Sequence, residues 1–184
     1  MKWRHFWPAI LALGLAVAVL AGPGTMRAGQ SADLTAEKDL TPESLMHAVA
    51  GFAFELGDEP QDPDVFLQRR RGDCDDFAQL ASRVLTAHGY HAKQVVVMMG
   101  QQTHVVCYVQ ESRGYLDYNR RADPHPVVAS DGSLDDIAQK VALSFRSQWT
   151  MASEFQYENK RPRYLAIVFP QRPRAATALV AAGG

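Results

Sequence analysis

The stretch from residue 73 to residue 118 constrains the fold most, because the spacing of its apolar residues changes once from that of a helix to that of strands. Its first part predicts a helix that ends near Gly89, since apolar residues recur there at helical spacing: Phe77, Leu80, Ala81, Val84 and Leu85. The pattern then becomes typical of strands, in three short runs separated by turns: residues 93–99, 103–110 and 115–118. A helix followed by consecutive short strands predicts an α+β fold, with the helix packed on an antiparallel sheet.

Weaker patterns flank this stretch. Thr41 and Pro42 suit the N-cap and the first position of a helix, and apolar residues at helical spacing continue that helix toward a stop at Gly57. Residues 58–64 and 120–133 are expected as loops. Residues 133–146 are expected as a helix, and residues 149–157 and 163–169 as a last strand pair.

Residues 1–28 have the layout of a secretory signal peptide, in which basic residues precede an apolar run and small residues follow it. A membrane-spanning helix needs about 20 apolar residues, and this run is shorter. We therefore expect the leader to be removed and no stable membrane span to remain; an uncleaved N-terminal anchor is the alternative. The rest of the chain divides into a linker, one domain and a disordered tail: residues 29–40, 41–170 and 171–184.

The charge balance argues against nucleic acid as a partner. Removal of residues 1–28 takes away three basic and no acidic side chains, which leaves 16 Lys and Arg against 20 Asp and Glu. A mildly acidic domain lacks the basic surface that a phosphate backbone requires. With only 2 cysteines in the chain, neither a disulfide scaffold nor a four-thiolate zinc site can form.

The candidate chemistry begins at Cys74, which is the first residue of its predicted helix if Asp73 is the N-cap. Backbone N–H groups and the helix dipole at that position favour a thiolate. His104 and Asp117 lie on neighbouring predicted strands, which can bring them together beside the start of the helix. A thiol, an imidazole and a carboxylate can act as nucleophile, general base and orienting group. We therefore predict a catalytic triad of Cys74, His104 and Asp117.

Each of these residues also has a purely structural interpretation. Cys74 and His104 could be core residues, and Asp117 could simply flank a turn. Cys107 lies three residues after His104, so it should face the other side of its strand as a core thiol. In an oxidising compartment a disulfide between Cys74 and Cys107 is a further alternative, and it would block the nucleophile.

Three segments in order, GDCDDFAQLASRVL, THVVCYV and GYLDYN, resemble the transglutaminase-like superfamily. Its members carry a Cys at a helix start, a His on a strand and an Asp on the next strand, within a papain-like α+β fold. The GDC start followed by acids looks most like the bacterial transglutaminase-like cysteine peptidases, several of which are exported. The resemblance implies the same triad at Cys74, His104 and Asp117. By analogy with papain-like enzymes, Gln68 is a candidate donor to the oxyanion, with a solvated loop residue as the alternative.

Asp73, Asp75 and Asp76 allow two interpretations. They can stabilise the start of the helix electrostatically, which we prefer and under which no cofactor is needed. They can also hold calcium, because Ca²⁺ takes clustered carboxylates and some of the resembling exported peptidases are calcium-dependent.

Together these features predict an exported, periplasmic or secreted cysteine peptidase or amidase. It would hydrolyse protein or peptide substrates through a thioester on Cys74. Water is the expected acceptor because the resembling bacterial branch is peptidase-like. Two alternatives are acyl transfer to an amine, as in a transglutaminase, and a catalytically inactive envelope binding module on the same fold.

Overall fold

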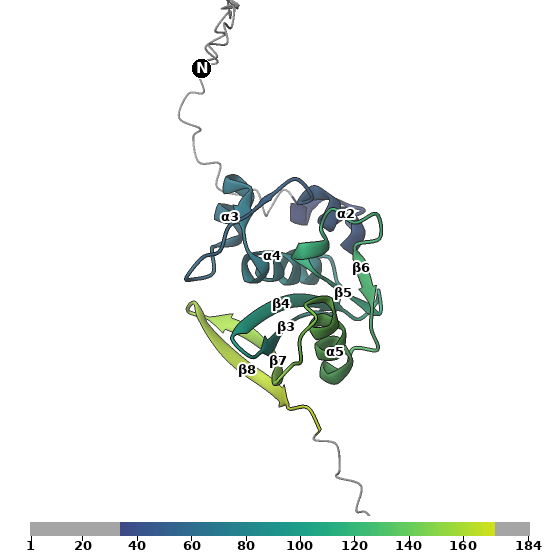
Figure 1. Ribbon diagram of the computed structural model, residues 1–184. Coiled ribbons are helices and arrows are strands. Elements are labelled where there is room, and N and C mark those ends of the chain that lie inside the picture. The colour runs from purple at the N-terminus through teal and green to yellow at the C-terminus, as the bar shows by residue number, and fades with distance from the viewer. Residues whose placement is uncertain (1–33, 172–184) are drawn as a thin grey trace, which may run out of the picture.

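The computed structural model describes residues 34–171 (Figure 1). The predicted signal peptide at 1–28, the first residues of the predicted linker at 29–40, and all but the first residue of the predicted tail at 171–184 lie outside the described residues. Within residues 34–171, no helix has the length and apolar character that crossing a membrane requires.

The principal helices each begin after a polar side chain that accepts a hydrogen bond from the first turn: α2 (Pro42–Ala48), α3 (Pro63–Arg69), α4 (Cys74–Ala87) and α5 (Leu134–Ser144). Proline occupies the first position of α2 and α3, where its missing N–H leaves no orphan donor. The helices predicted after residue 73 and at 133–146 are confirmed as α4 and α5.

Six strands form one antiparallel sheet in the order β6-β5-β4-β3-β7-β8. Their bounds are β3 (Ala92–Met99), β4 (Gln102–Val109), β5 (Gly114–Leu116), β6 (Val127–Ala129), β7 (Met151–Glu158) and β8 (Arg161–Val168). The three strands predicted after α4 and the last strand pair are therefore confirmed, and so is the α+β class. Short β1 (Ala53–Phe54) and β2 (Arg71–Gly72) pair separately and parallel.

Helices cover both faces of the sheet (Figure 1). On one face, α4 packs across β3 and β4, and α2 and α3 lie beyond it. Side chains of α4 such as Phe77 and Leu80 form one core with Cys107 and Phe155 of the strands. On the other face, α5 packs on β3 and β7 through a second core. The long helix with Cys74 at its start is thus fixed against the strands that precede Asp117.

Three segments differ from expectation: the first helix, the loop predicted at 58–64, which gives way to the unpredicted α3 at Pro63, and the loop predicted at 120–133. The first predicted helix ends at Ala48 rather than near Gly57, because residues 53–54 pair with β2 and need extended backbone. Phe52 still reaches the core from the turn after α2. The predicted loop at 120–133 contains β6, a three-residue strand whose pairing with β5 no local pattern marks.

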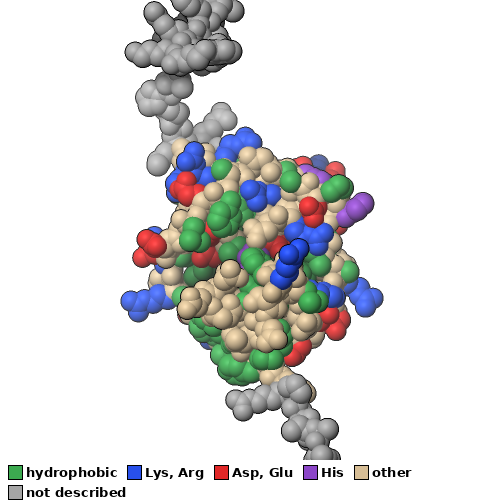
Figure 2. All heavy atoms as spheres, in the orientation of Figure 1, with side chains coloured by type: hydrophobic (Ala, Val, Ile, Leu, Met, Phe, Trp, Pro, Cys, Tyr) green, Lys and Arg blue, Asp and Glu red, His purple; other side chains and the backbone are tan. Residues whose placement is uncertain are grey.

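Large apolar side chains are exposed on the edge strand β8 and directly after it: Tyr164, Leu165 and Ile167 on the strand, and Phe169 after it. In Figure 2, apolar side chains gather at the lower edge of the molecule, where β8 ends. Charged side chains of both signs are scattered elsewhere on this face.

Candidate active site

Cys74 is the first residue of α4, and it is partly buried against the core. Asp73 is the N-cap, as predicted, and its carboxylate accepts hydrogen bonds from the first turn of the helix. An N–H at the first position of a helix has no acceptor within that helix. The backbone N–H of Cys74 is therefore available to a developing oxyanion, and the positive end of the helix dipole faces the thiol.

His104 and Asp117 form a buried pair. Nε2 of His104 lies 2.8 Å from Oδ1 of Asp117, with the two residues 3% and 2% exposed. His104 belongs to β4, and Asp117 follows β5, the antiparallel neighbour of β4. The same Asp117 oxygen accepts the N–H of Asn119 at 2.9 Å, which fixes the carboxylate. The ring of Phe145 packs on the imidazole, with the two centroids 4.8 Å apart.

The structure also brings His104 to Cys74. Burial by itself would lower the pKa of His104, but the hydrogen bond to Asp117, the nearby Cys74 thiol and the charges of both groups raise it from 6.5 to about 10. Because Nε2 is committed to Asp117, Nδ1 is the ring nitrogen left for the thiol. An imidazole held in its charged form beside a cysteine at a helix start stabilises the thiolate. His104 and Asp117 are thus paired, and Cys74 lies beside the imidazole.

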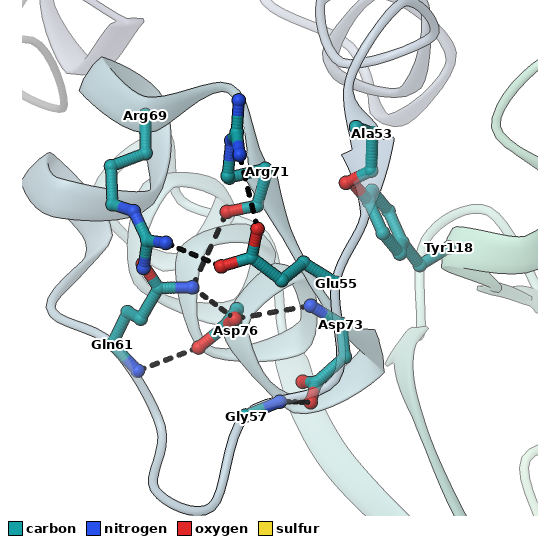
Figure 3. A network of polar contacts seen from close by, with 9 residues as sticks. All are labelled: Ala53, Glu55, Gly57, Gln61, Arg69, Arg71, Asp73, Asp76 and Tyr118. Carbon is teal, nitrogen blue, oxygen red and sulfur yellow. Dashed lines mark hydrogen bonds and ion pairs between the residues drawn. The ribbon is translucent and has the colours of Figure 1, made fainter.

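The acids around Cys74 are held by a network of amide donors (Figure 3). Both oxygens of Asp76 accept hydrogen bonds from Gln61, at 2.6 Å from its backbone N and 2.6 Å from Nε2. The N–H of Asp73 also donates to Asp76, at 3.1 Å, and Gly57 donates to Asp73 at 3.0 Å. A Cβ at Gly72 would lie 2.2 Å from an Asp76 oxygen, so only glycine allows this approach. Asp73 and Asp76 therefore have a structural role in starting α4.

Asp75 is placed differently. Its carboxylate accepts a hydrogen bond of 3.1 Å from the hydroxyl of Tyr157, on β7. Burial, followed by its contacts with Asp73 and the charge of Asp76, raises the pKa of Asp75 from 3.8 to about 7. Burial and the charge of Asp75 likewise raise the pKa of Tyr157, so its hydroxyl stays protonated and donates. Asp75, directly after Cys74, is thus tethered to β7, and its charged form is disfavoured by burial and by the neighbouring acids.

The other two candidates from the sequence lie apart from this centre. Gln68 is an exposed residue of α3, and among residues 34–171 it forms no hydrogen bond with Cys74, His104 or Asp117. Cys107 is fully buried in the core under α4, and burial raises its pKa to about 12. Cys74 and Cys107 are both free thiols, so no disulfide joins them.

Three residues of the site were not predicted from the sequence: Gln61, Phe145 and Tyr157. Gln61 stands in a segment expected only as a loop, 15 residues before the acid that it binds. Tyr157 meets Asp75 across 82 residues of chain. No local pattern marks such contacts, and only the assembled sheet and helices create them.

Comparison with known proteins gives one family match and two solved structures. Residues 45–130 match the family model described as the transglutaminase-like superfamily. Two solved structures of Legionella pneumophila LapG are similar in fold. The one described as calcium-bound is 17% identical, with a TM-score of 0.46 over 74% of this chain and 76% of that chain. The one described as EGTA-treated is 16% identical, with a TM-score of 0.44 over 66% of this chain and 69% of that chain. No curated protein sequence matches significantly.

Proposed function

We propose that this chain, which belongs to the transglutaminase-like superfamily through residues 45–130, is a cysteine peptidase or amidase. One observation carries the proposal: a buried His104–Asp117 pair beside a partly buried cysteine at a helix N-terminus. A core cysteine and a core histidine would need neither the orienting carboxylate nor the helix start. The arrangement supports acyl transfer through a thioester on Cys74.

In the first half of the reaction, the Cys74 thiolate attacks the carbonyl carbon and a C–S bond forms. The N–H of Cys74 donates to the oxyanion that develops. The protonated His104 gives its Nδ1 proton to the leaving nitrogen, the C–N bond breaks, and the amine departs. Asp117 keeps the imidazole oriented throughout.

In the second half, neutral His104 removes a proton from water, which attacks the thioester. The C–S bond breaks, the acid product leaves, and the thiolate–imidazolium pair is restored. An amine in place of water would give transamidation. We propose hydrolysis, with amine transfer and a non-catalytic binding module as the rivals that the experiment below distinguishes.

The experiment compares the wild-type chain with Cys74→Ser and His104→Ala on a casein and peptide panel, with a labelled primary amine present. Peptide products from the wild type alone support hydrolysis. Incorporation of the amine without new termini would instead identify a transglutaminase. No reaction from any of the three, despite folded protein, would leave the binding module as the function.

Export to the periplasm or the medium is part of the same proposal. It is supported by the basic, apolar and small-residue order of residues 1–28. Mass determination of the protein recovered from cell fractions tests it. A mature chain that begins near residue 22 or residue 29 outside the cytoplasm is expected, and an intact Met1 in the cytoplasm would refute it.

Calcium fits the acidic start of α4 as an addition to this proposal. Asp73, Asp75 and Asp76 each offer an oxygen within 4.8 Å of the others, and Ca²⁺ prefers such ligands. Both Asp76 oxygens are taken by amide donors, whereas burial, followed by the contacts with Asp73 and the charge of Asp76, raises the pKa of Asp75, and a cation would offset these effects. The Asp73 oxygens likewise accept from the N–H groups of Gly57 and Asp75, so Asp75 is the residue that would hold the ion, with Asp73 and Asp76 beside it. The ion would supply positive charge that fixes the helix start beside Cys74, and a rise in Tm with calcium over EGTA tests its binding.

A further inference from the structure

The ring of Phe145 lies against the imidazole of His104, the proposed general base. The two ring centroids are 4.8 Å apart and the ring planes meet at 58°, so the contact is tilted rather than parallel. Phe145 is the C-cap residue of α5, whereas His104 lies on β4. The contact therefore joins the second core, to which α5 contributes, to the candidate active site.

The exposed fraction differs between Phe145 and the groups beneath it. His104 and Asp117 are buried, whereas Phe145 is half-buried. A side chain that touches a buried ring and itself reaches the surface separates that ring from water. Phe145 thus forms part of the boundary between solvent and the hydrogen bond that joins His104 to Asp117.

The end of α5 fixes the direction of Phe145. The N–H of Arg146 donates to the carbonyl of Leu143 at 3.0 Å. The N–H of Ser147 donates to the carbonyl of Ala142 at 2.9 Å. These two bonds, with Arg146 in the left-handed region at a φ of 52°, make a Schellman motif that ends the helix at Phe145. The backbone of Phe145 is therefore held by the helix before it and by a closed turn after it.

The chain after this turn is anchored beside His104. Thr150 donates from its backbone N and from its hydroxyl to the carbonyl of Met98, at 2.8 Å and 3.2 Å. Met98 follows Val97, which pairs with His104 across β3 and β4. The segment from Phe145 to Thr150 is thus fixed at both ends, which limits the movement of Phe145 away from the imidazole.

Water at the contact between His104 and Asp117 would weaken it in two ways. Water would compete as a hydrogen-bond donor to the carboxylate, and it would raise the local dielectric constant, which weakens the attraction between imidazolium and carboxylate. General acid–base catalysis needs the ring nitrogen of His104 within hydrogen-bond reach of the reacting atom. An apolar cover over the pair therefore has a direct chemical consequence.

We infer that Phe145 is a positioning residue, whose ring excludes water from the hydrogen bond between His104 and Asp117 and so keeps the imidazole directed at Cys74. Its part in turnover rests on the proposed hydrolase function, whereas the exclusion of water can be measured without substrate. Because Phe145 acts through His104 and not through the substrate, its loss lowers kcat and leaves KM unchanged.

The first measurement is the rate at which the Nε2 proton of His104 exchanges with water, followed by NMR in the folded full chain with ¹⁵N-labelled histidine. We expect exchange to be at least about tenfold faster in Phe145→Ala than in the wild type, because the hydrogen bond loses its cover. Phe145→Leu keeps an apolar side chain over part of the imidazole and should give an intermediate rate.

Val168→Ala is the matched control for packing. Val168 also packs on the second core from a partly buried position, but it lies on the edge strand β8. This variant should keep the wild-type exchange rate and kcat even where it lowers Tm. Unchanged exchange in Phe145→Ala, or equal acceleration in Val168→Ala, would overturn the inference.

Kinetics on the casein or peptide substrate complete the test. In Phe145→Ala, kcat should fall about tenfold or more without a change in KM, and Phe145→Leu should recover part of the loss. A higher KM at unchanged kcat would overturn the inference, because it would make Phe145 a wall of the substrate site. If the wild type itself hydrolyses no substrate, the proposed function fails, while the exchange rates still decide whether Phe145 shields the pair.

Discussion

Nε2 of His104 lies 2.8 Å from Oδ1 of Asp117, and neither residue is more than 3% exposed. This contact commits one ring nitrogen and leaves Nδ1 for Cys74. Burial would lower the pKa of the imidazole, but the two hydrogen-bonding partners raise it to about 10. Asp117 is therefore the residue through which the charge and orientation of His104 are set.

Asp117→Asn tests this dependence. The amide keeps the shape but can present an N–H to Nε2, which favours the wrong tautomer and removes the negative charge. We expect kcat on the casein or peptide substrate to fall by at least about 10²-fold. The pKa of His104, followed by NMR, should fall from its raised value.

Asp123→Asn is the matched control, because Asp123 forms a half-exposed ion pair with Arg120 close to Asp117 in the chain. It should retain kcat. If Asp117→Asn kept wild-type kcat and a raised His104 pKa, Asp117 would have no role in positioning the imidazole.

The two thiols should differ in reactivity. Cys74 is partly buried at the helix start beside His104, whereas burial raises the pKa of Cys107 to about 12. We expect iodoacetamide to modify Cys74 alone in the folded chain and both cysteines after denaturation, as followed by peptide mass spectrometry. His104→Ala should slow the modification of Cys74. Faster modification of Cys107 in the folded protein would contradict the assignment of the nucleophile.

Asp75→Asn should stabilise the protein in a pH-dependent way. The folded-state pKa of Asp75 is raised from 3.8 to about 7. A raised pKa means that the wild type loses stability as pH rises from about 4 to about 7. The amide does not titrate, so its advantage in free energy of unfolding should grow over this range and stay constant above it.

Urea denaturation in EGTA across this pH range measures the difference between the two proteins. Asp135→Asn is the control, since Asp135 is an exposed acid in the first turn of α5. Its effect should show no such rise between pH 4 and 7. A pH-independent effect of Asp75→Asn would mean that neither burial nor the neighbouring acids raise the pKa of the Asp75 carboxyl.

Alanine variants of Gln61 and Gln68 can be compared directly, because Gln61 contacts Asp76 in the structure, whereas Gln68 was a candidate through its position six residues before Cys74. Gln61→Ala removes two hydrogen bonds from the buried carboxylate of Asp76, so we expect a loss of about 1–3 kcal/mol in unfolding free energy. Gln68→Ala changes an exposed side chain and should stay within about 0.5 kcal/mol. A selective loss of kcat in Gln68→Ala with normal stability would restore Gln68 as an oxyanion donor.

The sequence predicted those parts of the fold that depend on residues close together in the chain, and it missed those that depend on contacts between distant segments. The start of α4 depends on Asp73 and the residues beside it, so a local pattern locates Cys74. The order of β4 and β5 brings His104 and Asp117 together because consecutive strands pair as neighbours. The early end of α2 and the presence of β6 depend on pairing with distant strands, which local propensity does not encode.

The same limit applies to the site. Spacing alone favoured Gln68, six residues before the nucleophile, whereas the fold turns Gln61 toward the acids of α4. Tyr157 and Phe145 reach the centre from elements that follow it in the chain. Their roles emerge from packing of the sheet against α4 and α5, so the sequence offered no signal for them.

The most direct test of the central claim is to trap the acyl-enzyme. Wild-type, Cys74→Ser and His104→Ala chains are quenched with acid during turnover of the same peptide substrate, and the adduct is located by mass spectrometry. The account predicts an acyl group on Cys74 in the wild type, none in Cys74→Ser and a strongly reduced amount in His104→Ala. An acyl group on Cys107, or the same amount on Cys74 with and without His104, would contradict it.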